Sequence, residues 1–206
     1  AEEALRKIIK KNGETAVEAP GEAAFYGPKI DFMARDAIGR EHQVATIQLD
    51  MNQPERFDLF CINEKSEKER IVMIHAAIMG SIERFMSVLI EHVAGAFPLW
   101  LAPVQVKVLP ISDKQLDYAK GVFEKLKEAG IRAELDESNE SLGKKVRQAK
   151  TEKVPYLAVI GDKEKESGTV TVESRSDQTK VGSVKEGTKV EEFINKLREE
   201  IKTKKN

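Results

Sequence analysis

The feature that most constrains the fold of this chain is a change in hydrophobic rhythm near Ala102. Before it, the runs KIDFMAR (29–35) and HQVATIQLD (42–50) alternate apolar and polar residues. Two runs with a period of two, joined by a short turn, predict an antiparallel hairpin of half-buried strands. After it, strand-like and helix-like runs alternate, which is typical of an α/β domain. The sequence therefore predicts two domains, residues 1–101 and residues 102–206.

The first domain is expected to be α+β, an antiparallel sheet with helices. Residues 2–11 carry apolar side chains at helical spacing and predict a short amphipathic helix. The apolar run 71–79 predicts a buried strand that stops at Gly80. From Ile82 the apolar residues follow the spacing i, i+3, i+4 and i+7, with Ser81 as the expected N-cap. We expect this helix to bury its apolar stripe against the sheet.

The second domain is expected to be α/β, with helices over a mixed sheet. Its strand-like and helix-like runs are separated by turn residues such as Gly130. In chain order we predict a strand at 104–111, a helix at 115–129, a strand at 131–135, a helix at 141–150, strands at 154–162 and 169–174, and a helix at 190–202.

Charge and cysteine content exclude some kinds of protein. The chain has 34 basic and 35 acidic residues, so any nucleic-acid contact must come from a local basic face or a specific pocket. The single Cys61 excludes an internal disulfide and a zinc site with several cysteines. A reducing compartment is the natural one for such a chain. We therefore expect a cytoplasmic protein.

The apolar stretch 85–106 has the length of a membrane span but not its composition. Glu91, His92, Pro98 and Pro103 interrupt it, so we expect no transmembrane helix and no membrane partner. The chain opens with Ala-Glu-Glu, without an initiator Met or a signal segment, and we interpret this start as that of a processed or excised product.

Five segments stand out by their order and spacing: FYGPKIDF (25–32), TIQLD (46–50), PERFDL (54–59), IHAAIMGSIERF (74–85) and FPLWLAPVQV (97–106). Together they resemble the threonyl-tRNA synthetases, a family of class II aminoacyl-tRNA synthetases. The later segments DESNESLGKKVRQA (136–149), VPYLAVIGDKE (154–164) and SGTVTVESR (167–175) resemble the anticodon-binding domain of that family. The resemblance implies a partial class II catalytic domain, with the third motif but not the first two, followed by an anticodon-binding domain.

The resemblance also implies an activity, the ATP-dependent attachment of threonine to its tRNA. ATP with Mg would be the cofactors, threonine and threonine tRNA the partners, and a homodimer the state of the full-length enzyme. No DNA partner is implied. Because the first two motifs, and with them the main ATP arginine, are absent, we expect the chain alone to be inactive.

The family pattern assigns roles to residues of the first domain. Arg84, in the first turn of the expected helix, matches the ATP-binding arginine of the third motif, where the helix dipole also favours an anion. Tyr26 and Lys29 would line the pocket for the amino acid and the tRNA 3′ end. The residues expected to contact ATP or threonine are Gln43, Thr46, Gln48 and Ser81. Without the resemblance, the same patterns fit a surface arginine, a strand-entry turn and a half-exposed strand face.

His75 matches one of three zinc ligands with which the family recognises threonine. A single His on an apolar strand, taken by itself, is usually a core residue. The other two ligands of the family lie in a region outside this chain, and Cys61 does not match either of them. By resemblance Zn belongs to the family, but we expect that this chain alone does not hold it.

In the second domain, Asn139 and Glu164 match positions that read anticodon bases in the family. Lys144, Lys145 and Arg147 follow on one expected helix. They either hold RNA phosphates or form the solvated face of that helix.

Several positions differ from the family pattern. Val44-Ala45 replaces Cys-Gly, Ala76 and Ser138 each replace an Arg, and Glu173 replaces an anticodon-contacting Arg. Three interpretations follow. The chain is a segment of an active threonine–tRNA ligase, a catalytically inactive synthetase-like protein that binds tRNA or a partner, or an engineered module in which packing residues replace polar ones.

Overall fold

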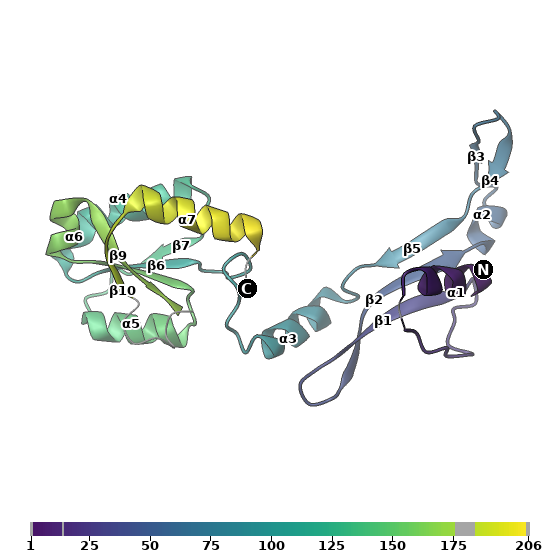
Figure 1. The fold of residues 1–206 in the computed structure, drawn as a ribbon, viewed down its shortest axis with the longest axis horizontal. Coiled ribbons are helices and arrows are strands. Elements are labelled where there is room, and N and C mark those ends of the chain that lie inside the picture. The colour runs from purple at the N-terminus through teal and green to yellow at the C-terminus, as the bar shows by residue number, and fades with distance from the viewer. Residues whose placement is uncertain (1, 14, 176–183, 205–206) are drawn as a thin grey trace. The chain divides into compact units, whose positions relative to one another are not determined.

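The computed structural model describes residues 2–13, 15–175 and 184–204 (Figure 1). The chain divides into two compact units, Ala1–His92 and Val93–Asn206. The first carries the short antiparallel sheet and the second carries the mixed sheet, so the change in hydrophobic rhythm corresponds to a change in architecture.

The first unit is built on a three-stranded antiparallel sheet. Its strands are β1 (Lys29–Arg35), β2 (Glu41–Asp50) and β5 (Met73–Ala77), and β2 lies in the centre. The predicted hairpin is confirmed as β1–β2, and the predicted helix at 2–11 is confirmed as α1 (Glu2–Lys11). The antiparallel α+β class expected for this region is therefore correct.

The two faces of this sheet differ in chemistry, and the polar face is the more buried one. Cross-strand register places Ile30, Ile47 and Ala76 side by side on the apolar face. The opposite face carries Asp31, Thr46, Gln48 and His75. Ile74 on the apolar face is 62% exposed, whereas Gln48 is only 7% exposed. An open apolar face of this kind is typical of a surface that packs against further protein.

Short elements after β2 were missed by the sequence prediction. The helix α2 (Asn52–Arg56) follows β2, and β3 (Phe60–Ile62) pairs with β4 (Lys68–Arg70). The side-chain oxygen of Asn63 closes the turn by accepting the backbone N–H groups two and four residues further on, each at 3.0 Å. Strands of three residues are too short for an alternating pattern to reveal them.

The helix α3 (Ile82–His92) begins where the sequence predicts, but its apolar stripe is not covered. None of its residues is buried, and Met86 and Ile90 are 52% and 45% exposed. The expectation that α3 buries this stripe against the sheet is wrong for this chain. The helix follows β5 beyond the end of the sheet and does not cross a sheet face (Figure 1).

The second unit is an α/β domain around a five-stranded mixed sheet, as predicted. The strand order is β10-β9-β8-β6-β7. Strands β7, β6 and β8 are parallel to one another, β9 is antiparallel to β8, and β10 is antiparallel to β9. Helices α4 and α7 cover one face and α5 lies on the other (Figure 1). The bounds are β6 (Val106–Pro110), η1 (Asp113–Gln115), α4 (Leu116–Glu128), β7 (Ala133–Leu135), α5 (Leu142–Thr151), β8 (Tyr156–Ile160), α6 (Asp162–Ser167), β9 (Thr169–Ser174), β10 (Val184–Lys189) and α7 (Val190–Thr203).

Strand β6 is buried on both faces and separates two apolar clusters. Val106 and Val108 belong to the larger cluster, which includes the fully buried Leu126 of α4 and Phe193 of α7. Leu109 belongs to the smaller cluster on the α5 side. Burial on both faces explains why this strand reads as an almost continuous apolar run in the sequence. No helix in the described part of the chain is long and apolar enough to cross a membrane.

The segment between α3 and β6 is tied to the second unit by basic side chains that reach its carbonyl groups. Lys153 donates to the carbonyl oxygen of Ala94. Arg175 donates to that of Phe97 at 2.5 Å. The second unit therefore includes residues that precede its first strand.

Candidate functional site

Asp31, in the middle of β1, is the centre of a polar cluster on the more buried face of the first sheet. Lys29 donates from Nζ to Oδ2 of Asp31 at 2.5 Å. Gln43 Nε2 and Thr46 Oγ1 donate to Oδ1 at 2.8 and 2.7 Å. Burial raises the pKa of Asp31, but the hydrogen bonds from Lys29 and Thr46 outweigh it, so the net pKa is lowered. Lys29, Gln43 and Thr46 were identified from the sequence as site residues, whereas Asp31, which binds all three, was not.

A β-bulge brings Gln43 and Thr46 to the same face of the sheet. Strict alternation would put them on opposite faces, because they are three positions apart. In the β1–β2 ladder, Phe32 pairs with Ala45 whereas Met33 pairs with Gln43, so β2 contains one extra residue. An extra residue reverses the alternation beyond it. Gln43 therefore shares the Asp31 cluster, which the alternation alone did not predict.

His75 pairs with Gln48 across the β2–β5 ladder and contacts two further side chains. Its Nε2 lies 2.9 Å from Oδ2 of Asp50, which is fully buried, and the ring of Tyr26 packs edge-on at 5.6 Å between centroids. Burial raises the pKa of Asp50, but hydrogen bonds from the backbone of α2 and from His75 outweigh it and lower the pKa. An ionised carboxylate requires a donor, so the proton of this contact lies on Nε2 of His75.

The side chain of Gln48 has a buried donor without a partner. It is 7% exposed, and its amide nitrogen has no hydrogen-bond partner in the described part of the chain. An unpaired buried donor costs about 1–3 kcal/mol. Since Gln48 lies beside His75, this donor belongs to the same surface as the His75 ring. A ligand with an oxygen acceptor would satisfy it.

The turn before β1 is placed by a close backbone approach to β2. A Cβ added to Gly27 would lie 1.8 Å from the carbonyl oxygen of Leu49, so only glycine fits there. The N–H of Leu49 donates to the carbonyl of Pro28 at 3.1 Å. The contact fixes the chain between Tyr26 and Lys29, whose side chains reach the His75 and Asp31 clusters.

Arg84, in the first turn of α3, is exposed, and its guanidinium lies beside Gly80. A Cβ added to Gly80, whose φ is +58°, would lie 3.3 Å from the Gln43 carbonyl oxygen and 3.5 Å from an Arg84 guanidinium nitrogen. Ser81 acts as a weak cap, with Oγ 3.5 Å from the Arg84 N–H nitrogen, and donates to Glu83 at 2.7 Å. Gly80 thus has both the Arg84 guanidinium and the backbone of Gln43, a hydrogen-bond donor to Asp31, as neighbours.

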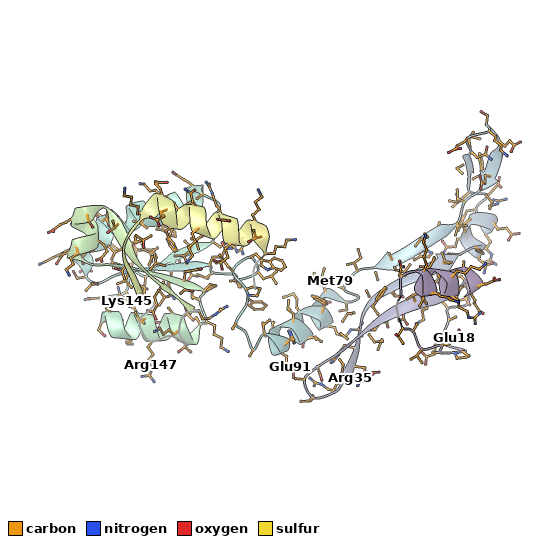
Figure 2. The ribbon with its side chains drawn as sticks, in the orientation of Figure 1. Glu18, Arg35, Met79, Glu91, Lys145 and Arg147 are labelled. Atoms are coloured by element: carbon orange, nitrogen blue, oxygen red, sulfur yellow. The ribbon has the colours of Figure 1, made fainter. Side chains whose placement is uncertain are left out.

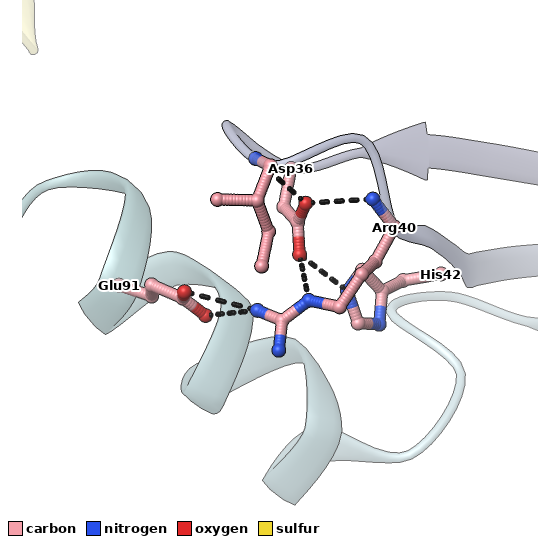
Figure 3. A network of polar contacts seen from close by, with 5 residues as sticks. Asp36, Arg40, His42 and Glu91 are labelled. Carbon is pink, nitrogen blue, oxygen red and sulfur yellow. Dashed lines mark hydrogen bonds and ion pairs between the residues drawn. The ribbon is translucent and has the colours of Figure 1, made fainter.

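A second polar network links α3 to the turn between β1 and β2 (Figure 3). Arg40 donates to Asp36 from Nε at 2.5 Å and to Glu91 of α3 from Nη2 at 2.7 and 2.9 Å. His42 Nε2 lies 3.1 Å from the same Asp36 carboxylate. Burial raises the pKa of Asp36, but hydrogen bonds from Arg40 and His42 outweigh it and the pKa falls well below its usual range. The sequence reasoning missed this network, although Asp and Arg four residues apart around a Gly turn were a usable signal.

The residues present do not fit a zinc site by themselves. The part of the chain that the structure describes contains no group of three or more His, Cys, Asp or Glu side chains placed to hold a metal. His75 offers one ring nitrogen, and Cys61 is exposed on β3, a different element. A catalytic zinc needs three protein ligands and an open position. The described residues therefore supply one candidate ligand, His75, with Asp50 behind it.

In the second unit, Asn139 lies exposed in the loop between β7 and α5. Lys144, 64% exposed, pairs with Glu140 at 2.5 Å. Arg147 is exposed and points away from the sheet, whereas Lys145 turns toward it (Figure 2). Lys145 is only 4% exposed, so the hypothesis that it holds a phosphate is wrong. The reason is its place on the inward side of α5.

Glu164 follows the carboxyl end of β8, and Asn139 follows that of β7. Because β7, β6 and β8 are parallel, the two residues lie at the same edge of the sheet. Glu164 accepts from the hydroxyl of Thr171 at 2.8 Å and from the N–H of Gly161 at 2.9 Å. Burial raises its pKa, but these hydrogen bonds outweigh it and lower the pKa. The carboxylate is fixed and ionised, with lone pairs left for another donor.

Glu173, on β9, forms an ion pair with Lys150 of α5 at 2.6 Å, with side chains 20% and 41% exposed. Register with Leu157 places Glu173 on the α5 face of the sheet. Its negative charge is thus locally compensated. A position where the family pattern has Arg keeps one positive charge nearby, now on Lys150.

The two units match two different family models. Residues 2–93 match the tRNA synthetase class II core domain (G, H, P, S and T), and residues 105–200 match the anticodon binding domain. The chain is 52% identical over 206 residues to a threonine–tRNA ligase of Acetivibrio thermocellus, and 51% identical over 204 residues to one of Sulfurihydrogenibium. These matches cover 100% and 99% of this chain but 32% and 31% of the relatives.

Two solved structures are similar to this chain over almost its whole length. The crystal structure described as the RNA binding domain of threonyl-tRNA synthetase from Cryptosporidium parvum has a TM-score of 0.89 and 39% identity, covering 97% of this chain and 49% of that one. A putative threonyl-tRNA synthetase from Aeropyrum pernix has a TM-score of 0.70 and 31% identity, covering 98% of this chain and 48% of that one.

A segment of class II synthetase core joined to an anticodon-binding domain defines a class II aminoacyl-tRNA synthetase. Within that class, the chain belongs to the threonyl-tRNA synthetase family and spans about a third of the length of the curated relatives that it matches. The family and the fold class expected from the sequence are confirmed.

Proposed function

We propose that this chain is part of a threonine–tRNA ligase, an enzyme that activates threonine with ATP and transfers it to threonine tRNA. In this proposal, residues 1–101 form one wall of the activation site, and residues 102–206 bind the anticodon. ATP with Mg, threonine and tRNA are the substrates and cofactors of the full-length enzyme, which acts as a homodimer in the cytoplasm.

The polar face of the first unit suits adenylate formation. This reaction moves negative charge onto the departing pyrophosphate, and a fixed cation beside it lowers the barrier. Arg84 is the exposed cation for that role, because its guanidinium can hold a phosphate oxygen with two parallel hydrogen bonds. Tyr26 and His75 form the adjoining edge for the amino acid. Lys29, held by Asp31, supplies a second cation on the same face of the sheet.

The observation that carries the proposal is the unpartnered amide nitrogen of Gln48. It is buried beside His75, on the face that also holds Thr46 and Asp31. A folded protein seldom leaves a buried donor unpaired, and a functional role is one of the few reasons for it. A carboxylate, carbonyl or phosphate oxygen of a substrate at this position would complete it.

The open apolar face of the first sheet supports the view that this unit belongs to a larger catalytic domain. Ile47 and Ile74 are exposed there, as are Met86 and Ile90 on α3. Each large apolar side chain gains about 1.5–3 kcal/mol when it is fully buried. In this proposal, segments within the remaining two thirds of the relatives' length would cover these side chains.

The second unit supports tRNA as the partner. Asn139 and Glu164 lie at one edge of the sheet, and Lys144 and Arg147 are exposed on the helix that follows Asn139. Side-chain amides and carboxylates read base edges of unpaired loops, while Lys and Arg hold phosphates.

A catalytically inactive tRNA- or partner-binding protein, natural or engineered, is the second candidate, and Glu173 is the observation that favours it. Two other departures from the family pattern do not. Ala45 and Ala76 lie on the apolar face of the sheet, opposite the Asp31 cluster. Their small apolar side chains therefore remove no polar group from the proposed activation site.

A chimera tests the proposal. This chain replaces the matching third of the Acetivibrio thermocellus ligase, and threonine-dependent ATP–pyrophosphate exchange is measured. We expect exchange by the chimera, a loss of about 100-fold or more with Arg84→Gln, and a loss of about 5-fold or more with Gln48→Leu. Arg35→Gln is the matched control, because Arg35 is 70% exposed and pairs with Glu41 at the far end of β1. It should leave exchange unchanged.

A folded chimera without exchange contradicts the ligase proposal and leaves the inactive binding protein. The 206-residue chain alone should show no exchange even with added zinc, because its described residues contain no group of three side chains placed to hold the metal. Robust exchange by the chain alone would mean that the site is complete within it.

A further inference from the structure

Lys145 is a buried lysine whose ammonium group lies at the carboxyl edge of two parallel strands. It is 4% exposed. Its Nζ lies 3.3 Å from the carbonyl oxygen of Pro110, the last residue of β6, and 3.3 Å from that of Asp136, which follows β7. The carboxylate of Asp136, 9% exposed, is 3.7 Å away. A buried charge needs such compensation, so the position of this ammonium group is fixed.

The partner of Lys145 organises the loop that follows. Asp136 Oδ1 accepts from the N–H of Ser138 at 2.9 Å and from its hydroxyl at 2.5 Å. This side-chain turn fixes the backbone directly before Asn139. Asp136 also donates its own N–H to the carbonyl of Val108 at 3.0 Å, which continues the β6–β7 ladder.

Two acidic residues of the loop are held by ion pairs. Glu137 pairs with Lys120 of α4 at 2.9 Å, and Glu140 pairs with Lys144 at 2.5 Å. Within the described part of the chain, the side chain of Asn139 makes no hydrogen bond and is exposed. The loop is therefore fixed on both sides of a single amide that is free to bind something else.

We propose that Lys145 is a positioning residue for the reading of an RNA base by Asn139. This rests on the proposed anticodon-binding function. Lys145 touches no RNA, because it is buried; it holds the ends of β6 and β7 and the Asp136 turn in one arrangement. A preorganised amide loses less entropy on binding, so the benefit falls on discrimination between bases rather than on overall attraction to RNA.

The test uses the whole 206-residue chain. Lys145→Met keeps an unbranched side chain of similar length and removes the charge, and Arg147→Met, on the exposed side of α5, is the control. Binding is measured to an anticodon stem-loop of threonine tRNA and to the same RNA with one anticodon base changed. Hydrogen exchange of the Ser138 amide reports on the loop without any RNA.

With Lys145→Met we expect faster hydrogen exchange at the Ser138 amide. The ratio of affinities for the two RNAs should fall about 10-fold or more, while the affinity for the altered RNA changes little. Arg147→Met should weaken both RNAs equally. Lys145→Arg should restore part of the discrimination. The double variant Lys145→Met/Asn139→Ala should discriminate no worse than Asn139→Ala, because both changes remove the same interaction.

Unchanged exchange at Ser138, or losses that add in the double variant, would overturn the inference. Ser138→Ala keeps the buried ion pair and should lose discrimination without unfolding, so the test does not depend on the stability of Lys145→Met. A wild-type chain that binds both RNAs equally would overturn the anticodon function itself, and the exchange result tells these two failures apart.

Discussion

Arg40 and Glu91 join the β1–β2 turn to α3: one guanidinium nitrogen lies 2.9 and 2.7 Å from the two carboxylate oxygens (Figure 3). Glu91 is two helical turns after Arg84, so the two residues lie on the same side of α3. The pair therefore helps to determine which side of α3 faces the β1–β2 turn. This matters because α3 has no buried apolar residue to do so.

Substitutions at Glu91 and at Asp36 should both lower the stability of the first unit, but by different amounts. Glu91→Gln should lower its stability only slightly and more at low salt than at high salt, because both side chains are about half exposed. Asp36→Ala should lower it more, because Asp36 also accepts the backbone N–H groups of Ile38 and Arg40. Urea unfolding at two salt concentrations measures both. Equal losses would mean that the turn gains nothing from Asp36 beyond the ion pair.

The carboxylates Asp31 and Asp36 should make the first unit sensitive to acid. Each has a pKa lowered from 3.8 in the folded state. A lowered pKa means that the unfolded chain binds protons more readily, so the stabilisation is complete above about pH 4 and is lost as the pH falls through the lower folded value. Thermal unfolding of the unmodified chain and of the Asp36→Asn variant, measured from about pH 6 to about pH 2, tests this pH dependence. The variant should show a flatter dependence.

Gly27→Ala should be strongly destabilising, because a Cβ would lie 1.8 Å from the carbonyl oxygen of Leu49. The backbone must then move, at a cost of about 1–3 kcal/mol or more. Gly121→Ala is the matched control: it lies inside α4 with no atom within 4 Å of the new Cβ. This change should stabilise by about 0.5–1 kcal/mol. Opposite signs in chemical unfolding are the expected result, and a neutral Gly27→Ala would contradict the close approach.

Glu173→Gln should raise the affinity of the chain for RNA. The change removes a negative charge from the α5 face of the sheet and releases Lys150 from its ion pair. One more available cation should steepen the salt dependence of binding by about one unit of log slope or less. Glu128→Gln, at the end of α4 on the opposite face, is the control and should have no effect. Filter binding of a tRNA at several salt concentrations measures both, and identical curves would show that this face does not touch RNA.

Elements with a clear apolar period in the sequence were mostly predictable. The helices α1, α3, α4, α5 and α7 and the strands of both sheets up to β9 follow from periodicity, whereas α2, β3, β4 and α6 are too short to show one. β10 was missed because VKEGTK lacks an apolar alternation. The family pattern identified His75 and Thr46, but not Asp50 and Asp31, whose carboxylates hold these two side chains. A polar residue in a strand does not reveal its partners, because these come from other strands.

The sequence by itself determined which residues share a side of each strand or helix, and by resemblance which family they belong to. Only the tertiary structure decided which side is covered. It buried the polar face of the first sheet, left the stripe of α3 open, and turned Lys145 inward while Lys144 stayed outside. It also moved Gln43 to the Asp31 face through a bulge. The physical reason is that periodicity is a local property of the backbone, whereas burial depends on which other element packs against it.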